Sequence, residues 1–173
     1  VTPEAVIQSI DAPSIYHVPA IMHGQHLDDL VLSITHTVAR KEPDHHAWNG
    51  FIRHLDNARG CVRIGIVGKY VELQDAYKSI NEALLQAATY CDRKLEIVYI
   101  HAEKLNEDNA GELLSVLDGV VIAPGFGNRG IEGKLAAIKW CREHDMPTFG
   151  ICLGMQCIVI EFARDVLGLS GAN

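Results

Sequence analysis

The chain has 173 residues, of which 48% are hydrophobic and 21% are charged, and its formal net charge is −7. This balance is typical of a soluble globular protein, and the length suffices for one α/β domain or for parts of two. The negative charge argues against nucleic acid or an anionic membrane as a partner, because both favour a basic face. No apolar run approaches the roughly 20 residues that a membrane-spanning helix needs.

Cysteine usage and the N-terminus give two further expectations. The five cysteines include no Cys-x-x-Cys pair and no zinc-type spacing with the nine histidines, so we expect free thiols in a reducing cytoplasm and no metal site. The segment from Val1 to Glu4 has neither a basic start nor an apolar core, which excludes a signal peptide there. It also lacks an initiator methionine, which predicts that the chain begins inside a longer protein.

The first part of the chain differs in pattern from the rest. Prolines between Asp11 and Pro19 predict extended and turn segments, because proline disfavours helix at the residue before it. A helix is expected from about Gln25 to Ala39, and a short amphipathic one from Trp48 to His54. We interpret residues 1–40 as the tail of another α/β domain and residues 41–61 as a linker.

From Val62 onward, apolar β-rich runs alternate with segments of helical period. The alternation predicts right-handed crossovers and a doubly wound, mostly parallel sheet with helices on both faces, formed by residues 62–173. Such a sheet normally continues beyond a fourth strand, so we expect this one to be incomplete at its C-terminal end. The predicted strands are Val62–Val67, Leu95–Ile100, Val120–Ala123 and Thr148–Ile151, and the predicted helices are Asp75–Cys91, Glu103–Leu117, Ile131–His144 and Leu153–Leu167.

The strongest chemical signal is Gly150-Ile151-Cys152-Leu153-Gly154, between a predicted strand and a predicted helix. It has the Gly-x-nucleophile-x-Gly spacing of a nucleophile elbow, with cysteine as the nucleophile. The small flanking residues relieve crowding in a tight turn, and the helix N-terminus favours the thiolate. We therefore predict that Cys152 is a catalytic nucleophile; the alternative is a core cysteine at an ordinary strand–helix turn.

An acyl-transfer nucleophile also needs an oxyanion hole. One donor is expected to be the amide of Leu153, and another to come from the glycine-rich loop between Ala123 and Gly130. The base stays unassigned. His144 is expected at the wrong end of the sheet, and nothing but its position marks His101, so we expect the base beyond Asn173.

Two other cysteines and one further loop are not assigned a catalytic role. Cys157 and Cys141 lie in predicted helices among apolar residues and are expected to be core cysteines. The loop from Gly68 to Ser79 lies at the same edge as the elbow, where it either is a solvated loop or contacts a ligand or partner. It lacks the spacing of a phosphate-binding loop.

Several motifs together resemble CTP synthases. The segment Gly65–Tyr70 with Asp75–Ser79 resembles the start of their class I glutamine amidotransferase domain, of flavodoxin-like fold, and Gly150–Gln156 is similar to its nucleophile motif. Upstream, Glu4–Ile7, Ser14–Pro19 and Leu27–Asp29 resemble the end of the synthetase (amidoligase) domain. The resemblance runs through essentially the whole chain.

This resemblance implies an activity and several ligands. Glutamine would be hydrolysed at Cys152 through a thioester, and the ammonia would aminate UTP in a reaction that uses ATP and Mg²⁺, with GTP as activator and a homotetramer as the assembly. Phe126 and Arg129 match residues near the GTP effector, and Ala12 matches a backbone position at the ATP site. The positions that match glutamine-binding and oxyanion residues are Gly125, Leu153, Gly154, Met155 and Gln156.

The sequence also departs from the family pattern. The segment Pro124-Gly125-Phe126-Gly127 has one glycine fewer than the usual Pro-Gly-Gly-Phe-Gly, so the second oxyanion amide is that of either Gly125 or Phe126. The chain lacks the family's phosphate loop, magnesium ligands, UTP site, and triad histidine and glutamate, so we expect it to be inactive alone. Two alternatives remain: a glutaminase subunit of another amidotransferase, and a non-catalytic doubly wound assembly module.

Overall fold

The computed structural model describes residues 2–173, and for Gln74 it describes the backbone alone. The chain forms two compact units, divided between Asn57 and Ala58. Among the described residues, all but one of the buried hydrophobic ones lie in the second unit, which also contains the predicted elbow.

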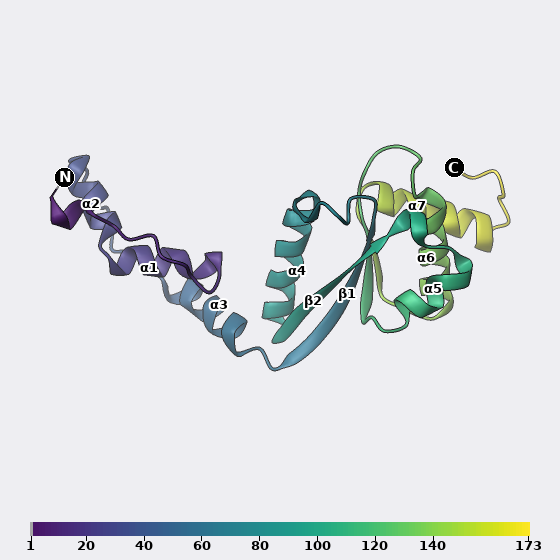
Figure 1. Ribbon diagram of the computed structural model, residues 1–173, viewed down its shortest axis with the longest axis horizontal. Helices are drawn as coiled ribbons and strands as arrows, with labels where there is room; N and C mark the ends of the chain where they lie inside the picture. Colours follow the sequence, from purple (N-terminus) through teal and green to yellow (C-terminus); the bar gives the residue numbers. More distant parts are fainter. Residues whose placement is uncertain (1) are drawn as a thin grey trace. The chain divides into compact units, whose positions relative to one another are not determined.

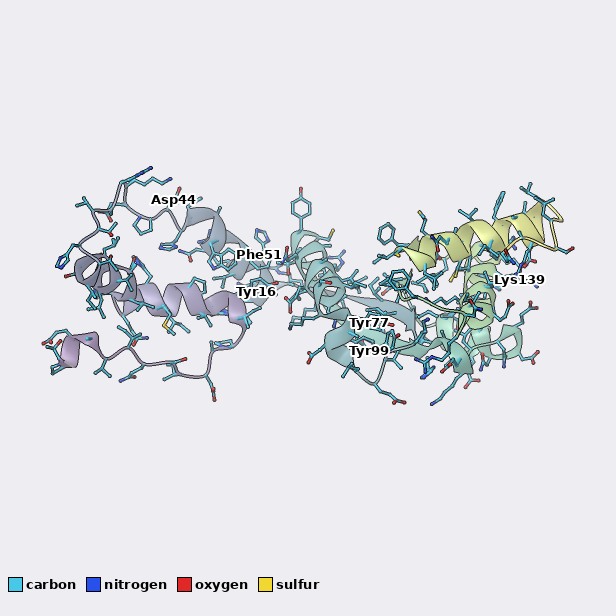
Figure 2. The ribbon with its side chains drawn as sticks, turned by 90° about the horizontal axis from the view of Figure 1, so that it is seen from above. Tyr16, Asp44, Phe51, Tyr77, Tyr99 and Lys139 are labelled. Carbon is cyan, nitrogen blue, oxygen red and sulfur yellow. The ribbon has the colours of Figure 1, made fainter. Side chains whose placement is uncertain are left out.

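The first unit is helical and has a small aromatic cluster. Tyr16 is buried, and its ring packs edge-on against Phe51 with the centroids 5.0 Å apart (Figure 2). The Trp48 indole donates a hydrogen bond to the Tyr16 carbonyl, at 2.9 Å. The α-helices of the unit are α1 (Val18–Gly24), α2 (Leu27–Ile34) and α3 (His46–Asn57), preceded by 3₁₀ turns at Pro3–Ala5 and Ile15–His17.

Two local predictions for this unit were wrong. Val18 and Pro19 are helical rather than extended, because Pro19 lies in the first turn of α1, where its missing N–H has no intrahelical acceptor to lose. The single helix expected from Gln25 to Ala39 is shorter and starts later, as α2, because His26 has a left-handed backbone (φ 59°) that separates it from α1.

The second unit contains a parallel four-stranded sheet in the order β2-β1-β3-β4. The strands are β1 (Gly60–Gly68), β2 (Arg93–His101), β3 (Gly119–Ile122) and β4 (Thr148–Gly150). Residues 119–122 of β3 are completely buried, as expected for a strand covered on both faces. The predicted α/β fold with a mostly parallel sheet is confirmed.

Helices cover both faces of this sheet (Figure 1). On one face, α4 packs with Tyr77 against Ile66 and Val121; on the other, α5, α6 and α7 enclose a larger core around Ile122 and Leu114. These helices are α4 (Lys78–Tyr90), α5 (Glu107–Leu114), α6 (Ile131–Glu143) and α7 (Leu153–Glu161).

Helix boundaries differ from the predictions where local hydrogen bonds end a helix. The helix expected from Glu103 begins as α5 at Glu107, because the Asn106 side chain caps it by accepting from the amides of Asp108 and Asn109. A separate 3₁₀ turn occupies Ala102–Lys104. At the C-terminal end, α7 passes into a π-helical turn at Phe162–Val166.

Candidate active site

The predicted site residues of the second unit gather at the carboxyl edge of the sheet. The loop from Lys69 follows β1, the glycine-rich loop follows β3, and Cys152 follows β4. Because the three strands are parallel and adjacent in the order β1-β3-β4, these segments emerge at the same edge. Open α/β sheets bind their ligands at this edge.

Cys152 is exposed and occupies a strained backbone conformation. Its φ is 54° and its ψ is −112°, and it is the N-cap residue of α7. A non-glycine residue in so sparsely populated a region costs on the order of 1–3 kcal/mol, which the surrounding structure must offset. The turn therefore has the sharp strand-to-helix geometry that the motif predicts, and it presents the thiol at the first turn of a helix.

The two glycines of the motif are required by close backbone contacts. A Cβ atom at Gly150 would lie 2.6 Å from the backbone of Gly154 and Met155, and one at Gly154 would clash with the carbonyl oxygen of Ile122. The same oxygen accepts a hydrogen bond from the Ile151 amide, at 3.0 Å. The end of β3 thus holds both sides of the elbow.

Two backbone segments contain the amides predicted to serve as oxyanion donors. Leu153 is the first residue of α7, so its amide has no intrahelical acceptor and is available to an oxyanion. In the loop after β3, Gly125 has φ 131° and Gly127 has φ 83°, values that L-residues rarely adopt. The choice between the amides of Gly125 and Phe126 as second donor stays open.

The loop after β1 is held against the glycine-rich loop. Lys69 is buried, and its ammonium donates to the carbonyls of Phe126 and Gly127. The hydroxyl of buried Tyr77 accepts from the amides of Lys69 and Tyr70, at 3.1 and 3.2 Å. The loop after β1 is therefore not simply a solvated loop, because Lys69 and Tyr77 are buried in contacts within the protein.

A second buried lysine, Lys134 of α6, contacts the start of the glycine-rich loop. Its side chain is inaccessible to solvent and donates to the carbonyl of Ala123, at 2.6 Å. Burial lowers the pKa of the Lys134 ammonium, the thiolate forms of Cys157 and Cys152 oppose that shift, and Lys69 adds to it. Sequence reasoning singled out neither lysine; the available signal for Lys134 was a lysine directly before the apolar run from Leu135 to Ile138.

Neither histidine of this unit reaches Cys152. His144 caps α6, stacks on Trp140 at 4.2 Å between centroids and contacts its carbonyl, at the opposite edge of the sheet. His101 ends β2, three strands from β4, which corresponds to about 14 Å. Its imidazole contacts Glu103 instead. The base is therefore neither of these residues.

The remaining predicted residues lie as follows. Met155 and Gln156 are exposed in the first turn of α7, and Gly154 is buried. Phe126 is 92% exposed, while Arg129 pairs with Glu103 at 3.3 Å. Gly125 and Arg129 both lie near Tyr70. Ala12 is half-buried in a loop of the first unit, away from any regular element.

All five cysteines are free, and two of them are core residues as predicted. Cys157 and Cys141 are fully buried, and burial raises the pKa of each thiol. Cys152 is instead exposed, as are Cys61 and Cys91. Exposure in a strained turn therefore distinguishes Cys152 from both core thiols.

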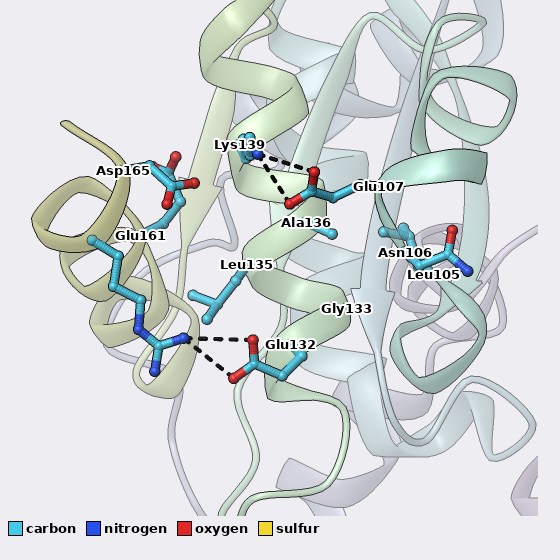
Figure 3. A pocket seen from close by; sticks show the side chains of 11 residues that line it. Leu105, Asn106, Glu107, Glu132, Gly133, Leu135, Ala136, Lys139, Glu161 and Asp165 are labelled. Atoms are coloured by element: carbon cyan, nitrogen blue, oxygen red, sulfur yellow. Dashed lines mark hydrogen bonds and ion pairs between the residues drawn. The ribbon is translucent and has the colours of Figure 1, made fainter. Parts of the chain in front are cut away.

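The second unit also has a pocket between the starts of α5 and α6 and the end of α7 (Figure 3). Lys139 pairs with Glu107 and Arg164 with Glu132 across it. None of the predicted site residues lines it, and its charges are largely used in these helix–helix pairs. We assign it a structural role.

The described part of the chain contains neither a metal-binding cluster nor a membrane-spanning helix. Within residues 2–173, no group of three or more His, Cys, Asp and Glu side chains is arranged to hold a metal ion. None of the helices described there is both long and apolar enough to cross a membrane.

Comparison with known proteins identifies the family. The model of the family described as "Glutamine amidotransferase class-I" matches residues 72–172, more than half of the chain and the part that contains the elbow. The chain belongs to this family. A solved structure described as "Trypanosoma brucei CTPS - glutaminase domain with bound acivicin" is similar to this amidotransferase chain, with 40% identity and a TM-score of 0.59. The similarity covers 63% of this chain and 43% of that one.

Curated relatives extend the similarity over the whole amidotransferase chain. The CTP synthase of Porphyromonas gingivalis is 53% identical over 173 residues, and that of Bacteroides fragilis is 56% identical over the same length. Each alignment covers 100% of this chain and 32% of the relative. The chain thus spans about a third of the length of these relatives, and the resemblance to CTP synthases seen in its motifs is confirmed.

Proposed function

We propose that this chain is the part of a glutamine-dependent CTP synthase in which glutamine is hydrolysed, with Cys152 as the nucleophile. The observation that carries the proposal is the backbone of Cys152, strained and held between two glycines that admit no side chain. A structural cysteine needs no such turn. The names of the 53–56% identical relatives supply the reaction class.

The proposed chemistry follows from the groups at this edge. The Cys152 thiolate attacks the side-chain carboxamide carbon of glutamine, and backbone amides of Leu153 and of the Gly125–Phe126 segment stabilise the oxyanion. The C–N bond then breaks with proton transfer to nitrogen, which leaves a γ-glutamyl thioester and ammonia. Water hydrolyses the thioester to glutamate and regenerates the thiol. A histidine outside this unit would carry the protons, since His101 and His144 lie elsewhere.

The remaining parts of the proposal concern the longer protein. Ammonia would aminate UTP with ATP and Mg²⁺, GTP would activate the glutaminase half, and the assembly would be a cytoplasmic homotetramer. Ala12 would lie at the ATP site, and Phe126 and Arg129 near GTP. Residues 1–40 would end the synthetase domain, residues 41–61 would link it, and residues 62–173 would begin the amidotransferase domain.

The test measures CTP formation from UTP, ATP and Mg²⁺ by a protein of the relatives' full length that contains this sequence. Glutamine and ammonia are supplied in separate assays. Cys152→Ala is expected to abolish the glutamine-dependent reaction and to leave the ammonia-dependent one near wild type. Cys91→Ala is the matched control, because Cys91 is also exposed but ends α4.

Each contrary result has a distinct meaning. If the Cys152 variant keeps using glutamine, Cys152 is not the nucleophile and the proposed site falls. If the wild type forms no CTP from either nitrogen source but still hydrolyses glutamine, the ammonia serves another synthase. Either result would overturn the proposal at an identified step.

A further inference from the structure

Lys69 is a buried lysine whose ammonium is bound by the backbone of another loop. The residue is 5% exposed, and its Nζ donates hydrogen bonds to the carbonyl oxygens of Phe126 and Gly127. In the described part of the chain, the lysines that pair with carboxylates are Lys78 and Lys139, so Lys69 has no counter-charge there. A buried ammonium needs compensation, and the two carbonyl dipoles of the glycine-rich loop provide it.

The backbone of Lys69 is itself fixed from α4. The hydroxyl of buried Tyr77 accepts hydrogen bonds from the amides of Lys69 and Tyr70, at 3.1 and 3.2 Å. A Cβ atom at Gly68 would lie 2.2 Å from this hydroxyl oxygen, so the hydroxyl packs directly against the end of β1. Lys69 is therefore held by its own backbone while its side chain holds the neighbouring loop.

The side chain of Lys69 also lies beside Gly125. A Cβ atom at Gly125 would lie 3.3 Å from the Lys69 Cε and 3.5 Å from the Tyr70 ring. Lys69 thus adjoins three successive residues of the glycine-rich loop: Gly125 with its stem, and Phe126 and Gly127 with its ammonium. These contacts constrain the peptide groups on both sides of Phe126, which include the two candidate oxyanion amides.

The direction of these hydrogen bonds decides which side of the loop is open to a ligand. In a trans peptide, the carbonyl of one residue and the amide of the next point in opposite directions, and residues 2–173 contain no cis peptide. Because Lys69 holds the carbonyls of Phe126 and Gly127, the amides of Gly127 and Asn128 point away from it. Within the described chain these two amides donate to no acceptor. The loop is therefore held by its carbonyls, and these amides stay available.

Such a constraint matters because of the composition of the loop. Gly125, Gly127 and Gly130 all have positive φ, and glycine loses more conformational freedom on ordering than any other residue. Oxyanion donors stabilise a transition state when they are already oriented and need no reorganisation during the reaction. A loop with three glycines reaches that state only if other contacts order it.

We propose that Lys69 is a positioning residue of the site: its ammonium orders the glycine-rich loop, so that the second oxyanion donor is in place before substrate binds. The role in catalysis rests on the proposed glutamine hydrolysis. The ordering of the loop by Lys69 does not, because it is a property of the free chain.

The first experiment measures ¹⁵N relaxation of the backbone amides in the 173-residue chain. Lys69→Met keeps an unbranched stem and removes the ammonium. We expect the order parameters of the Phe126 and Gly127 amides to fall from about 0.85, typical of rigid backbone, to below about 0.6. The control is Lys139→Met, which removes a lysine from the surface pair with Glu107 and should leave both amides rigid. A folded Lys69→Met protein with rigid loop amides would refute the ordering, and so would equal loosening in both variants.

A measurement on the wild type does not depend on the folding of any variant. The approach of the Lys69 Cε to Gly125 predicts nuclear Overhauser cross-peaks between the Lys69 ε-protons and the Gly125 α-protons. Their presence in the 173-residue chain supports the contact. Their absence in a folded sample with both residues assigned would overturn the proposal.

The catalytic role is tested in a protein of the relatives' full length that contains this sequence. An oxyanion donor acts in the transition state, so Lys69→Met should lower kcat for glutamine hydrolysis by roughly tenfold to hundredfold and change KM less than about threefold. CTP formation from ammonia should stay near wild type. A raised KM with an unchanged kcat would overturn the positioning role, because it would indicate substrate binding instead.

Failure of this inference can be told apart from failure of the proposed function. If the loop loosens in Lys69→Met but kcat is unchanged, the positioning role is wrong while glutamine hydrolysis stands. If the wild type does not hydrolyse glutamine, the proposed function and the catalytic role of Lys69 both fall, and the relaxation data still decide whether Lys69 orders the loop.

Discussion

The elbow at Cys152 depends on the absence of side chains at two neighbouring positions. Gly154 lies directly on the Ile122 carbonyl, and Gly150 lies on the first turn of α7. These contacts bring the end of β3 within hydrogen-bond distance of Ile151 and keep Cys152 at φ 54°. At the residue scale, the conformation of Cys152 is therefore set by backbone packing.

Gly154→Ala tests this packing. The new Cβ must displace either α7 or the end of β3, which we expect to reduce the free energy of unfolding by about 1–3 kcal/mol. The alkylation rate of Cys152 should change with it, because the turn cannot keep its conformation. Urea denaturation and peptide mass measure the two effects.

Gly171→Ala is the matched control, since a Cβ atom at Gly171 would have no other atom within 4 Å and the backbone there is unstrained. It should unfold like the wild type. Equal stability of both variants would show that the Ile122 contact does not constrain the elbow.

At the scale of elements, α6 joins the site to the outer helices. Its Lys134 points into the core, while its Arg142 forms a bidentate pair with Glu161 at the end of α7, at 2.8–3.3 Å. Glu161 is 2% exposed, so its carboxylate depends on this partner. The pair thereby fixes the far end of the helix that begins at Cys152.

Arg142→Met is expected to reduce the free energy of unfolding by about 3 kcal/mol, because it leaves the Glu161 carboxylate buried without a counter-charge. Lys139→Met removes a pair whose Glu107 is 67% exposed and should cost much less stability, because solvent screens that pair. Chemical denaturation of both variants makes the comparison. Equal losses would mean that burial of Glu161 does not decide the strength of its pair.

At the scale of the whole molecule, the two units differ in how much apolar surface they bury. Among the described residues of the first unit, Tyr16 is the one buried hydrophobic residue. Val31, Ile34 and Val38 are exposed. The second unit has cores on both faces of its sheet. A unit with little burial does not offset the conformational entropy lost on folding.

We therefore expect the excised segment of residues 58–173 to unfold cooperatively in urea, with a midpoint close to that of the second unit in the full chain. The excised segment of residues 1–57 should lose its circular dichroism gradually. A sharp transition in the shorter segment would show that its aromatic cluster around Tyr16 suffices as a core.

Local pattern was enough to predict the fold class and the candidate nucleophile. Near-continuous apolar strands alternating with helical periods specify a parallel sheet, because both faces must be covered. The spacing of Gly150, Cys152 and Gly154 specifies the elbow, because these small residues let the turn pack closely against its neighbouring backbone. The pattern did not predict helix boundaries that depend on local hydrogen bonds, such as the later start of α5 after its cap Asn106.

Only the tertiary structure decided which residues surround the thiol. The strand order places His101 three strands from β4, and the packing of α6 brings the Lys134 ammonium to the carbonyl of Ala123, where the glycine-rich loop begins. Both facts depend on pairings between residues far apart in the chain, and a residue's own sequence neighbours do not specify these. The sequence by itself thus determined the type of sheet and the nucleophile turn, whereas the buried charges around that turn follow from how the strands and helices come together.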